Sequence, residues 1–251
     1  MLKTYSFFNK NMIVSNYNKP IGGNNMETRI SGDSLPVVFC TLNKGESVIT
    51  ENGGMSWMSE GLTMNTSTNG GLLKGLGRAL AGESIFMNTY TADRDGAEIA
   101  FASSFPGRII EFDLAAGQSI IAQKRAFLCS EASVKLSMHF QKKLGAGLFG
   151  GEGFIMQKIE GPGKVFLEID GDVVEKVLAP GEILKVDNGY VAAMDSSVNM
   201  NIETVKGLKN IFLGGEGLFL TTLTGPGKVY LQTMPVSNLV GLVASALPRS
   251  N

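Results

Sequence analysis

The sequence predicts an all-β protein built from three repeated β-sandwich-like subdomains joined by short helices. Two observations support this prediction. Most apolar segments are short, rich in β-branched and aromatic residues, and bounded by Gly, Pro, Asn or Asp. They follow one another at intervals of roughly 8–12 residues, as in sandwiches and barrels. Several phrases also recur at a nearly constant period, which indicates one supersecondary unit used repeatedly.

The clearest repeat is a long glycine-punctuated phrase. Residues 148–167 read LFGGEGFIMQKIEGPGKVFL, and residues 212–231 read FLGGEGLFLTTLTGPGKVYL, 64 positions further on. A second phrase reads LNKGESVI from Leu42, LAAGQSII from Leu114 and LAPGEILK from Leu178. In the first copy, AGES and FPGR stand in looser correspondence to the two ends of the long phrase.

These phrases divide one domain, residues 26–248, into approximate subdomains at 36–112, 113–176 and 177–235, and a helix or tail follows at 236–251. Residues 1–25 are Asn-rich and precede the first repeat, so we interpret them as an upstream extension that lacks stable structure.

The predicted strands cover most of the remaining chain. One of them, KVFLEID at 164–170, has apolar residues on both of its alternating faces, which predicts a strand covered from both sides. In chain order the predicted strands are 37–42, 55–59, 85–92, 97–104, 108–114, 119–123, 126–131, 134–140, 154–161, 164–171, 182–188, 190–194, 198–204, 218–225 and 228–234.

The Gly-Pro-Gly phrases at 161–163 and 225–227 indicate tight turns, because Pro sets φ near −65° and Gly accepts positive φ. A phosphate-binding loop is the alternative, but such a loop normally leads into a helix, whereas here a strand-like segment follows.

Helices are predicted mainly ahead of the Gly-Glu phrases. The strongest spans 70–84, and 141–153 and 205–217 are glycine-broken counterparts. The tail at 236–247 is a further candidate. Apolar stripes of this kind mostly pack on a core, and docking on a partner protein or a membrane surface is the alternative. The stripe residues that would dock are Leu72, Leu73, Leu76 and Leu80 in the first helix and the 239–247 stripe in the tail.

Composition places the chain among cytoplasmic globular proteins. The chain has 22 basic and 23 acidic residues, and this balance argues against nucleic-acid binding through phosphates. Cys40 and Cys129 lie in apolar runs and are expected to be buried, reduced thiols. No apolar stretch approaches the 18 residues of a membrane span.

Candidate chemistry is sparse. His139 is the sole histidine, and we find no catalytic or nucleotide-binding motif, so we expect neither an enzyme nor a cofactor. Glu83, Glu152 and Glu216 recur once per copy and are weak candidates for a cation site, although each could instead satisfy its own glycine turn. Arg108, Lys164 and Lys228 are candidates for binding an anion or a partner, and shielding of strand edges is the alternative.

The GLLKGLGRALAGES segment, the PGRIIEFDL segment and the two GGEG…GPGK phrases resemble the altered inheritance of mitochondria (AIM) twenty-four family over about residues 26–248. The resemblance implies a fold like that of the tryptophan RNA-binding attenuation protein, used as three subdomains about a pseudo-threefold axis. Its fungal member is linked to inner-membrane organisation. The resemblance implies no catalytic residues.

Taken together, these observations predict a non-catalytic β scaffold that acts through protein–protein or oligomer surfaces. One alternative is a peripheral membrane organiser that docks through its apolar stripes. Another is a binder of a small molecule, anion or cation at a site between subdomains. RNA binding would rest on fold analogy alone and is opposed by the charge balance.

Overall fold

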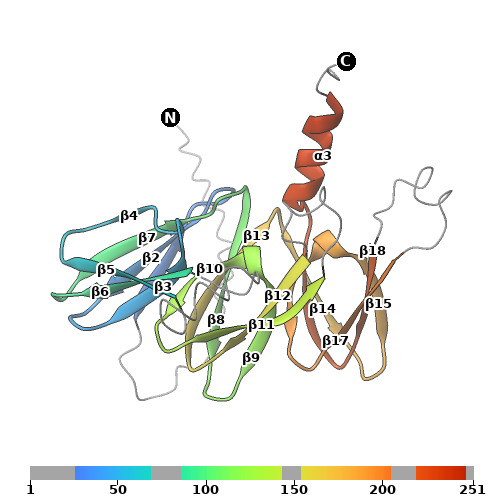
Figure 1. Cartoon of the computed structure of the whole chain (residues 1–251), viewed down its shortest axis with the longest axis horizontal. Helices are drawn as coiled ribbons and strands as arrows, with labels where there is room; N and C mark the ends of the chain where they lie inside the picture. The colour runs from blue at the N-terminus through green and yellow to red at the C-terminus, as the bar shows by residue number, and fades with distance from the viewer. Residues whose placement is uncertain (1–25, 69–85, 143–153, 205–218, 247–251) are drawn as a thin grey trace, which may run out of the picture.

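The computed structural model describes residues 26–68, 86–142, 154–204 and 219–246, and these form antiparallel β-strands with a single α-helix among them (Figure 1). The predicted all-β class is confirmed. The helix predicted at 70–84 lies outside the described residues, as do nearly all of those at 141–153 and 205–217. Residues 141 and 142, where a helix was expected to begin, instead end a strand.

The strands follow the β-rich segments closely. In order they are β1 Glu27–Ser31, β2 Val37–Leu42, β3 Ser47–Glu51, β4 Trp57–Met58, β5 Leu62–Thr68, β6 Phe86–Ala92, β7 Ala97–Ala102, β8 Gly107–Leu114, β9 Ser119–Gln123, β10 Phe127–Glu131, β11 Lys135–Lys142, β12 Phe154–Glu160, β13 Gly163–Asp170, β14 Val173–Leu178, β15 Ile183–Asp187, β16 Val191–Asp195, β17 Asn199–Thr204, β18 Phe219–Thr224 and β19 Gly227–Gln232. Short 3-10 turns, η1 Lys124–Ala126 and η2 Asn188–Tyr190, precede β10 and β16, and the helix α3 spans Val236–Ala246.

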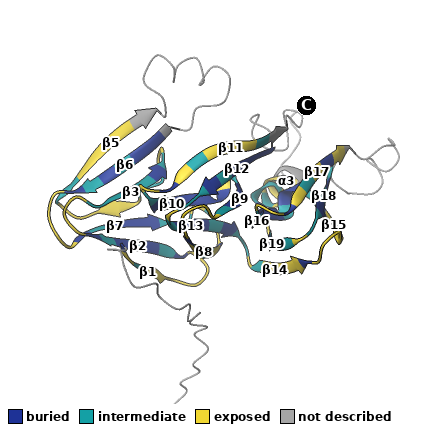
Figure 2. Cartoon of the chain, turned by 90° about the horizontal axis from the view of Figure 1, so that it is seen from below, coloured by how far each residue is buried: buried dark blue, intermediate teal, exposed yellow. Residues whose placement is uncertain are grey.

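These strands form four sheets, which we name A to D. Sheet A has the order β1-β2-β7-β4, sheet B β5-β6-β3-β10-β13-β8, sheet C β11-β12-β9-β16-β19-β14 and sheet D β15-β18-β17. Three buried apolar clusters separate them, one between A and B, one between B and C, and one between C and D. The fold is therefore a stack of four sheets with three layers of core (Figure 2).

The inner sheets are covered on both faces, as the sequence of β13 predicts. Val165 and Leu167 point into the cluster between sheets B and C, whereas Phe166 points into the cluster between sheets A and B. All three side chains are fully buried. Because successive side chains of a strand alternate in direction, one strand supplies two core layers at once.

The same strand pairing recurs along the chain. Leu42 of β2 lies opposite Ala97 of β7, Leu114 of β8 opposite Gly163 of β13, and Leu178 of β14 opposite Gly227 of β19. We therefore group β2–β7, β8–β13 and β14–β19 as the first, second and third modules. The predicted subdomain limits after residues 112 and 176 fall inside β8 and β14.

Neighbouring modules share a sheet. Pairing of β3 with β10 completes sheet B, and pairing of β9 with β16 completes sheet C. The modules consequently lie side by side in chain order (Figure 1). Among the described strands, pairing joins the first module to the second and the second to the third, and none joins the first to the third.

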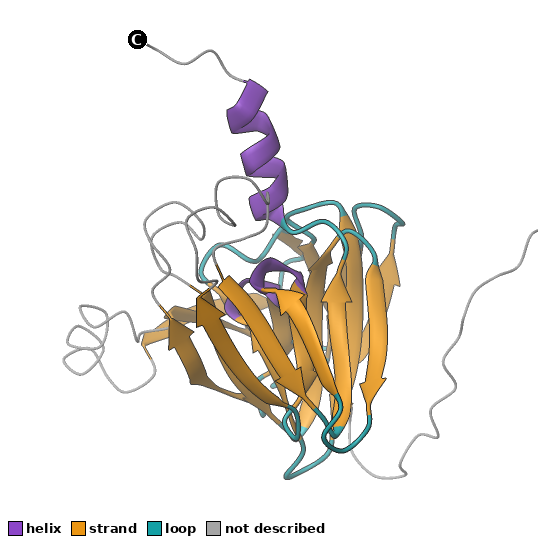
Figure 3. Ribbon diagram, turned by 90° about the vertical axis from the view of Figure 1, so that its right-hand side faces the viewer, coloured by secondary structure: helices purple, strands orange, loops and turns teal. Residues whose placement is uncertain are grey.

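Helix α3 begins where the third module ends and extends away from the sheets (Figure 3). The carboxylate of Asp170 accepts a hydrogen bond from the backbone N–H of Val236 (2.9 Å) and satisfies one of the unpaired donors at the helix start. Val240, Leu242 and Val243 are exposed along the helix. Within the described residues, no helix combines the length and the apolar character required to cross a bilayer.

Candidate functional site

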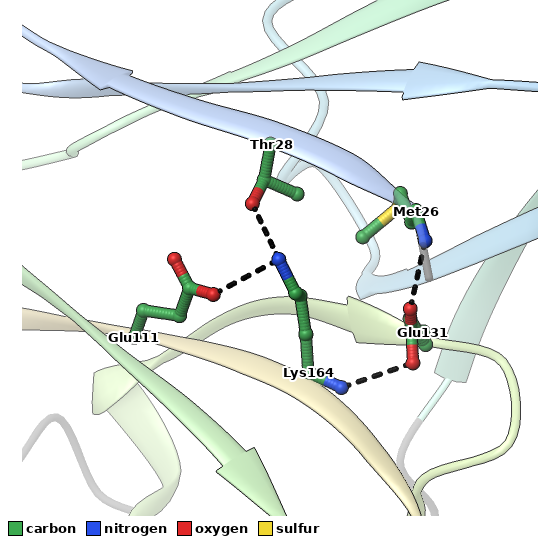
Figure 4. Close-up of polar contacts among 5 residues, drawn as sticks. All are labelled: Met26, Thr28, Glu111, Glu131 and Lys164. Atoms are coloured by element: carbon green, nitrogen blue, oxygen red, sulfur yellow. Dashed lines mark hydrogen bonds and ion pairs between the residues drawn. The ribbon is translucent and has the colours of Figure 1, made fainter. Parts of the chain in front are cut away.

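Lys164 lies near the start of β13, where β1 meets β8 and β13 of the second module (Figure 4). Its Nζ is 3.1 Å from Oε1 of Glu111 on β8 and donates to Oγ1 of Thr28 on β1 at 3.1 Å. Only 18% of its side chain is exposed. Lys164 was predicted to bind an anion or a partner, but its ammonium group is paired with the Glu111 carboxylate inside the fold.

Lys228 has an equivalent arrangement in the third module. Its Nζ is 3.0 Å from Oε2 of Glu175 on β14 and 5.6 Å from the ring centre of Tyr230. Glu111 and Glu175 are separated by the same 64 positions as Lys164 and Lys228. The ion pair is therefore shared by the second and third modules.

Arg108 does not occupy the equivalent place in the first module. It lies on β8, opposite Ile169 of β13. Its Nε is 2.9 Å from Oδ1 of Asp172, and the side chains of Arg108 and Asp172 are 49% and 70% exposed. The position that matches Lys164 in strand register is Glu98 on β7. The prediction that Arg108 is equivalent to Lys164 was wrong. It relied on the Pro-Gly of FPGR, but the strand that follows this Pro-Gly is β8, which pairs with β13 and is not a repeat of it.

A backbone contact that the sequence did not predict recurs in all three modules. The N–H of Lys164 donates to Oε2 of Glu131 (3.0 Å), and that of Lys228 donates to Oδ2 of Asp195 (2.7 Å). In the first module the N–H of Glu98 donates to Oγ of Ser59 (2.9 Å). The three acceptors differ chemically, so sequence similarity alone does not reveal them, although they stand 72 and 64 positions apart.

Glu131 also attaches the N-terminal strand. Its Oε1 accepts a hydrogen bond from the backbone N–H of Met26 at 3.2 Å, while Oε2 binds the N–H of Lys164 (Figure 4). Strand β1 pairs with β2 of the first module. One carboxylate and one ammonium group of the second module thus hold both the strand and its leading residue.

The remaining predicted residues do not form a site in the described part of the chain. Glu83, Glu152 and Glu216, together with Leu72, Leu73, Leu76 and Leu80, lie outside the described residues. His139 is exposed on β11, and the described residues contain no group of three His, Cys, Asp or Glu side chains arranged to hold a metal ion. A role of the repeated cations in binding an anion or a partner stays a prediction.

The two cysteines, far apart in sequence, meet in the cluster between sheets A and B. Cys40 and Cys129 are both fully buried and free. Burial raises the pKa of the Cys129 thiol well above its usual value, and the adjacent Cys40 raises it further. A thiol held protonated in this way is a packing residue and a poor nucleophile.

The outer face of sheet A carries a row of one cationic and two aromatic side chains, in which Arg29 and Trp57 are exposed and Phe39 is half-buried. The guanidinium carbon of Arg29 lies 4.0 Å from the ring centre of Phe39, and the ring of Phe39 contacts Trp57 edge-on, with centres 5.9 Å apart. Strand register places all three in line with Ala100. Exposed Trp and Arg side chains are typical of protein–protein contact sites.

The fold and the repeated contacts define a protein of stacked antiparallel β modules, each of which uses the same backbone contact to hold its strands together. Residues 28–234 match the family model described as mitochondrial biogenesis AIM24. The chain belongs to this family, and the resemblance noted in its sequence is confirmed.

Two streptococcal proteins are similar to the chain. An uncharacterised protein of Streptococcus pyogenes serotype M6 is 31% identical over 226 residues, which cover 86% of this chain and 89% of that protein. A Streptococcus pyogenes protein with a crystal structure from a structural genomics consortium matches with a TM-score of 0.74 and 25% identity, over 89% of this chain and 100% of that one.

Proposed function

We propose that the chain is a non-catalytic β scaffold that acts by binding proteins, copies of itself included, through the ends of its sheet stack. The observation that carries this proposal is the exposure of Trp57, which stands on the outermost sheet with 49% of its surface accessible. A half-exposed Trp next to Phe39 and Arg29 is costly to leave in water and suited to a buried contact.

The charged candidates support the same proposal. Lys164, Lys228 and Arg108 each have a carboxylate oxygen within about 3 Å, at 3.1, 3.0 and 2.9 Å. Because each positive charge is already offset by a carboxylate, these side chains favour a scaffold over an anion-binding site. A cytoplasmic location is part of the proposal, because two reduced thiols fit that compartment.

Site-specific photocrosslinking tests this function. A benzophenone amino acid replaces Trp57 in one variant and Met64, an exposed residue of β5, in a matched control. We expect protein adducts in cells from position 57 and none above background from position 64. Absence of protein adducts from position 57, or equal adducts from both positions, would contradict the proposal.

Peripheral membrane association is the second candidate, and α3 favours it. The helix reads VSNLVGLVASA and contains no charged residue. Val240, Leu242 and Val243 are exposed on it. Apolar helical surface of this kind can lie in the headgroup region of a bilayer.

Vesicle flotation tests the second candidate. Wild type and the double variant Val240→Asp with Val243→Asp are compared on vesicles with and without anionic phospholipid. Flotation of wild type and its loss in the double variant would support membrane association. If wild type stays with the soluble fraction on both kinds of vesicle, this candidate fails.

A further inference from the structure

Within the described residues, one strand edge at each end of the stack has no partner, although the equivalent edges inside the stack are paired. Internally, Ser130 of β10 lies opposite Ile49 of β3, and Met194 of β16 lies opposite Ile121 of β9. The two junctions have the same register, because equivalent residues are separated by the repeat spacings. Ser130 and Met194 are 64 positions apart, and Ile49 and Ile121 are 72 apart.

Strand β4 is the counterpart of β10 and β16. Met58 pairs with Ile99 of β7 as Ser130 pairs with Val165 of β13 and Met194 with Val229 of β19. Yet among the described strands β4 is the last of sheet A, whereas β10 and β16 are each paired on both sides.

Strand β15 is likewise the counterpart of β3 and β9. Lys185 pairs with Thr222 of β18 as Ile121 pairs with Lys158 of β12. In the described part of sheet D, β15 is an end strand. Figure 1 places β4 in the left-hand module and β15 at the right of the stack, so the two free edges belong to opposite ends of the molecule.

Burial distinguishes the free edges from the paired ones. Cys129 and Ser130, which match Trp57 and Met58 in register, are 0% exposed, and so are Ala193 and Met194. Trp57 is 49% exposed and Met58 40%. At the other end Ile183 is 61% exposed. Apolar residues at these positions therefore lack the cover that their internal counterparts have.

We infer that β4 of one copy pairs with β15 of a second copy, so that sheet A of the first continues sheet D of the second. This inference rests on the proposed function, and it identifies the protein that binds at Trp57 as a second copy of the chain. The register of the internal junctions sets Met58 opposite Lys185, Ser59 opposite Leu184 and Glu60 opposite Ile183. An antiparallel pairing of exposed edges is a general route of association between β proteins.

Charge agrees with this register. Glu60 and Lys185 become diagonal neighbours across the joined strands, within reach of each other's long side chains. Both are exposed in the single chain. Because the two edges are different, the contact is heterologous, and it generates a ring or an open chain of copies instead of a two-fold dimer.

Two end-blocking variants test the inference. Trp57→Glu places a charge at a position whose internal counterparts are buried, and Ile183→Asp places a carboxylate opposite Glu60. Both residues are exposed in the single chain, so the variants are expected to fold, which circular dichroism checks. Sedimentation velocity at tens of micromolar should show wild type as species larger than a dimer and each variant as a monomer. A mixture of the two variants retains one intact pair of edges and should form 1:1 dimers only.

A charge exchange tests the register. Met58→Lys should prevent assembly by facing Lys185, and addition of Lys185→Glu should restore it, while the control Met64→Lys should assemble as wild type does. A monomeric wild type, an assembly unaffected by Trp57→Glu, or a mixture that stays monomeric would overturn the inference. If position 57 still crosslinks to a different protein in that case, the proposed function stands and only self-pairing is wrong.

Discussion

Just after the turn that connects β12 to β13, the backbone N–H of Lys164 donates to Oε2 of Glu131, the last residue of β10, at 3.0 Å. Gly163 makes this approach possible, since a Cβ there would lie 2.8 Å from the same oxygen, and its φ of +135° is one that favours glycine. The repeated phrase Gly-Pro-Gly-Lys is thus explained by one structural unit. Glycine admits the carboxylate, the lysine N–H is satisfied, and the lysine side chain pairs with the adjacent strand.

Removal of the Glu131 carboxylate should destabilise the protein more than removal of an exposed one. Glu131→Ala leaves the N–H groups of Met26 and Lys164 without their acceptor, which we expect to lower the free energy of unfolding by roughly 1–3 kcal/mol. Asp172→Ala breaks only an exposed ion pair and should cost less than about 1 kcal/mol. Urea unfolding of the two variants makes the comparison, and equal effects would argue against the role assigned to Glu131.

Alanine at Gly163 should destabilise through backbone conformation and crowding. The positive φ and the short approaches to Ser133 Oγ (2.7 Å) and Glu131 predict a loss of about 1–3 kcal/mol. Gly241 of α3 is the matched control, because its Cβ would meet nothing within 4 Å and Ala favours helix. Thermal unfolding should show a lower midpoint for Gly163→Ala and an unchanged or higher one for Gly241→Ala.

Neither cysteine should react in the folded protein. Cys129 is fully buried, and burial followed by the neighbouring Cys40 raises its pKa well above the usual value. A thiol-specific chromogenic reagent at pH 8 should therefore modify Cys40 and Cys129 only after denaturant is added. Rapid modification of either thiol in buffer would show that the layer between sheets A and B opens readily.

Asp170 should make stability depend on pH. Burial raises its pKa above the ordinary 3.8, and the Val236 N–H and Arg125 lower it only in part. Because the folded state disfavours the ionised form, the stability contributed by Asp170 is fully present below its ordinary pKa and declines as pH rises through the folded pKa. Asp170→Asn keeps an acceptor for Val236 and removes the titration.

Unfolding curves from pH 3.5 to pH 7, a range set around that ordinary value, follow this effect. The stability of wild type relative to Asp170→Asn should fall as pH rises above about 4 and then level off. A difference that is constant with pH, or that grows in favour of wild type, would contradict the assignment.

Local patterns predicted most of the strands because each signal is carried by neighbouring residues, but the strand prediction missed β1, β3, β5 and β14. Alternation at Val165 to Ile169 predicted a strand buried on both faces, and the helix expected at 236–247 is observed at Val236–Ala246. The site could not be predicted in the same way. The equivalence of Glu98 to Lys164 depends on strand register, and the shared acceptor role of Ser59, Glu131 and Asp195 depends on contacts between distant segments.

The sharing of sheets between modules could not be predicted from local sequence patterns either. Pairing of β3 with β10 joins Ile49 to Ser130, and nothing in either segment specifies that partner. The meeting of Cys40 with Cys129 follows from the same stacking of sheets A and B.

Hydrogen–deuterium exchange at several protein concentrations tests the central claim, that the stack is completed by protein contacts at its two ends, most directly. The amides of Trp57 and Met58 and of Ile183–Val186 should become slower to exchange together as concentration rises, while strand β5 keeps its rate. Rates at both ends that do not change with concentration, in a chain that sediments as a monomer, would contradict it.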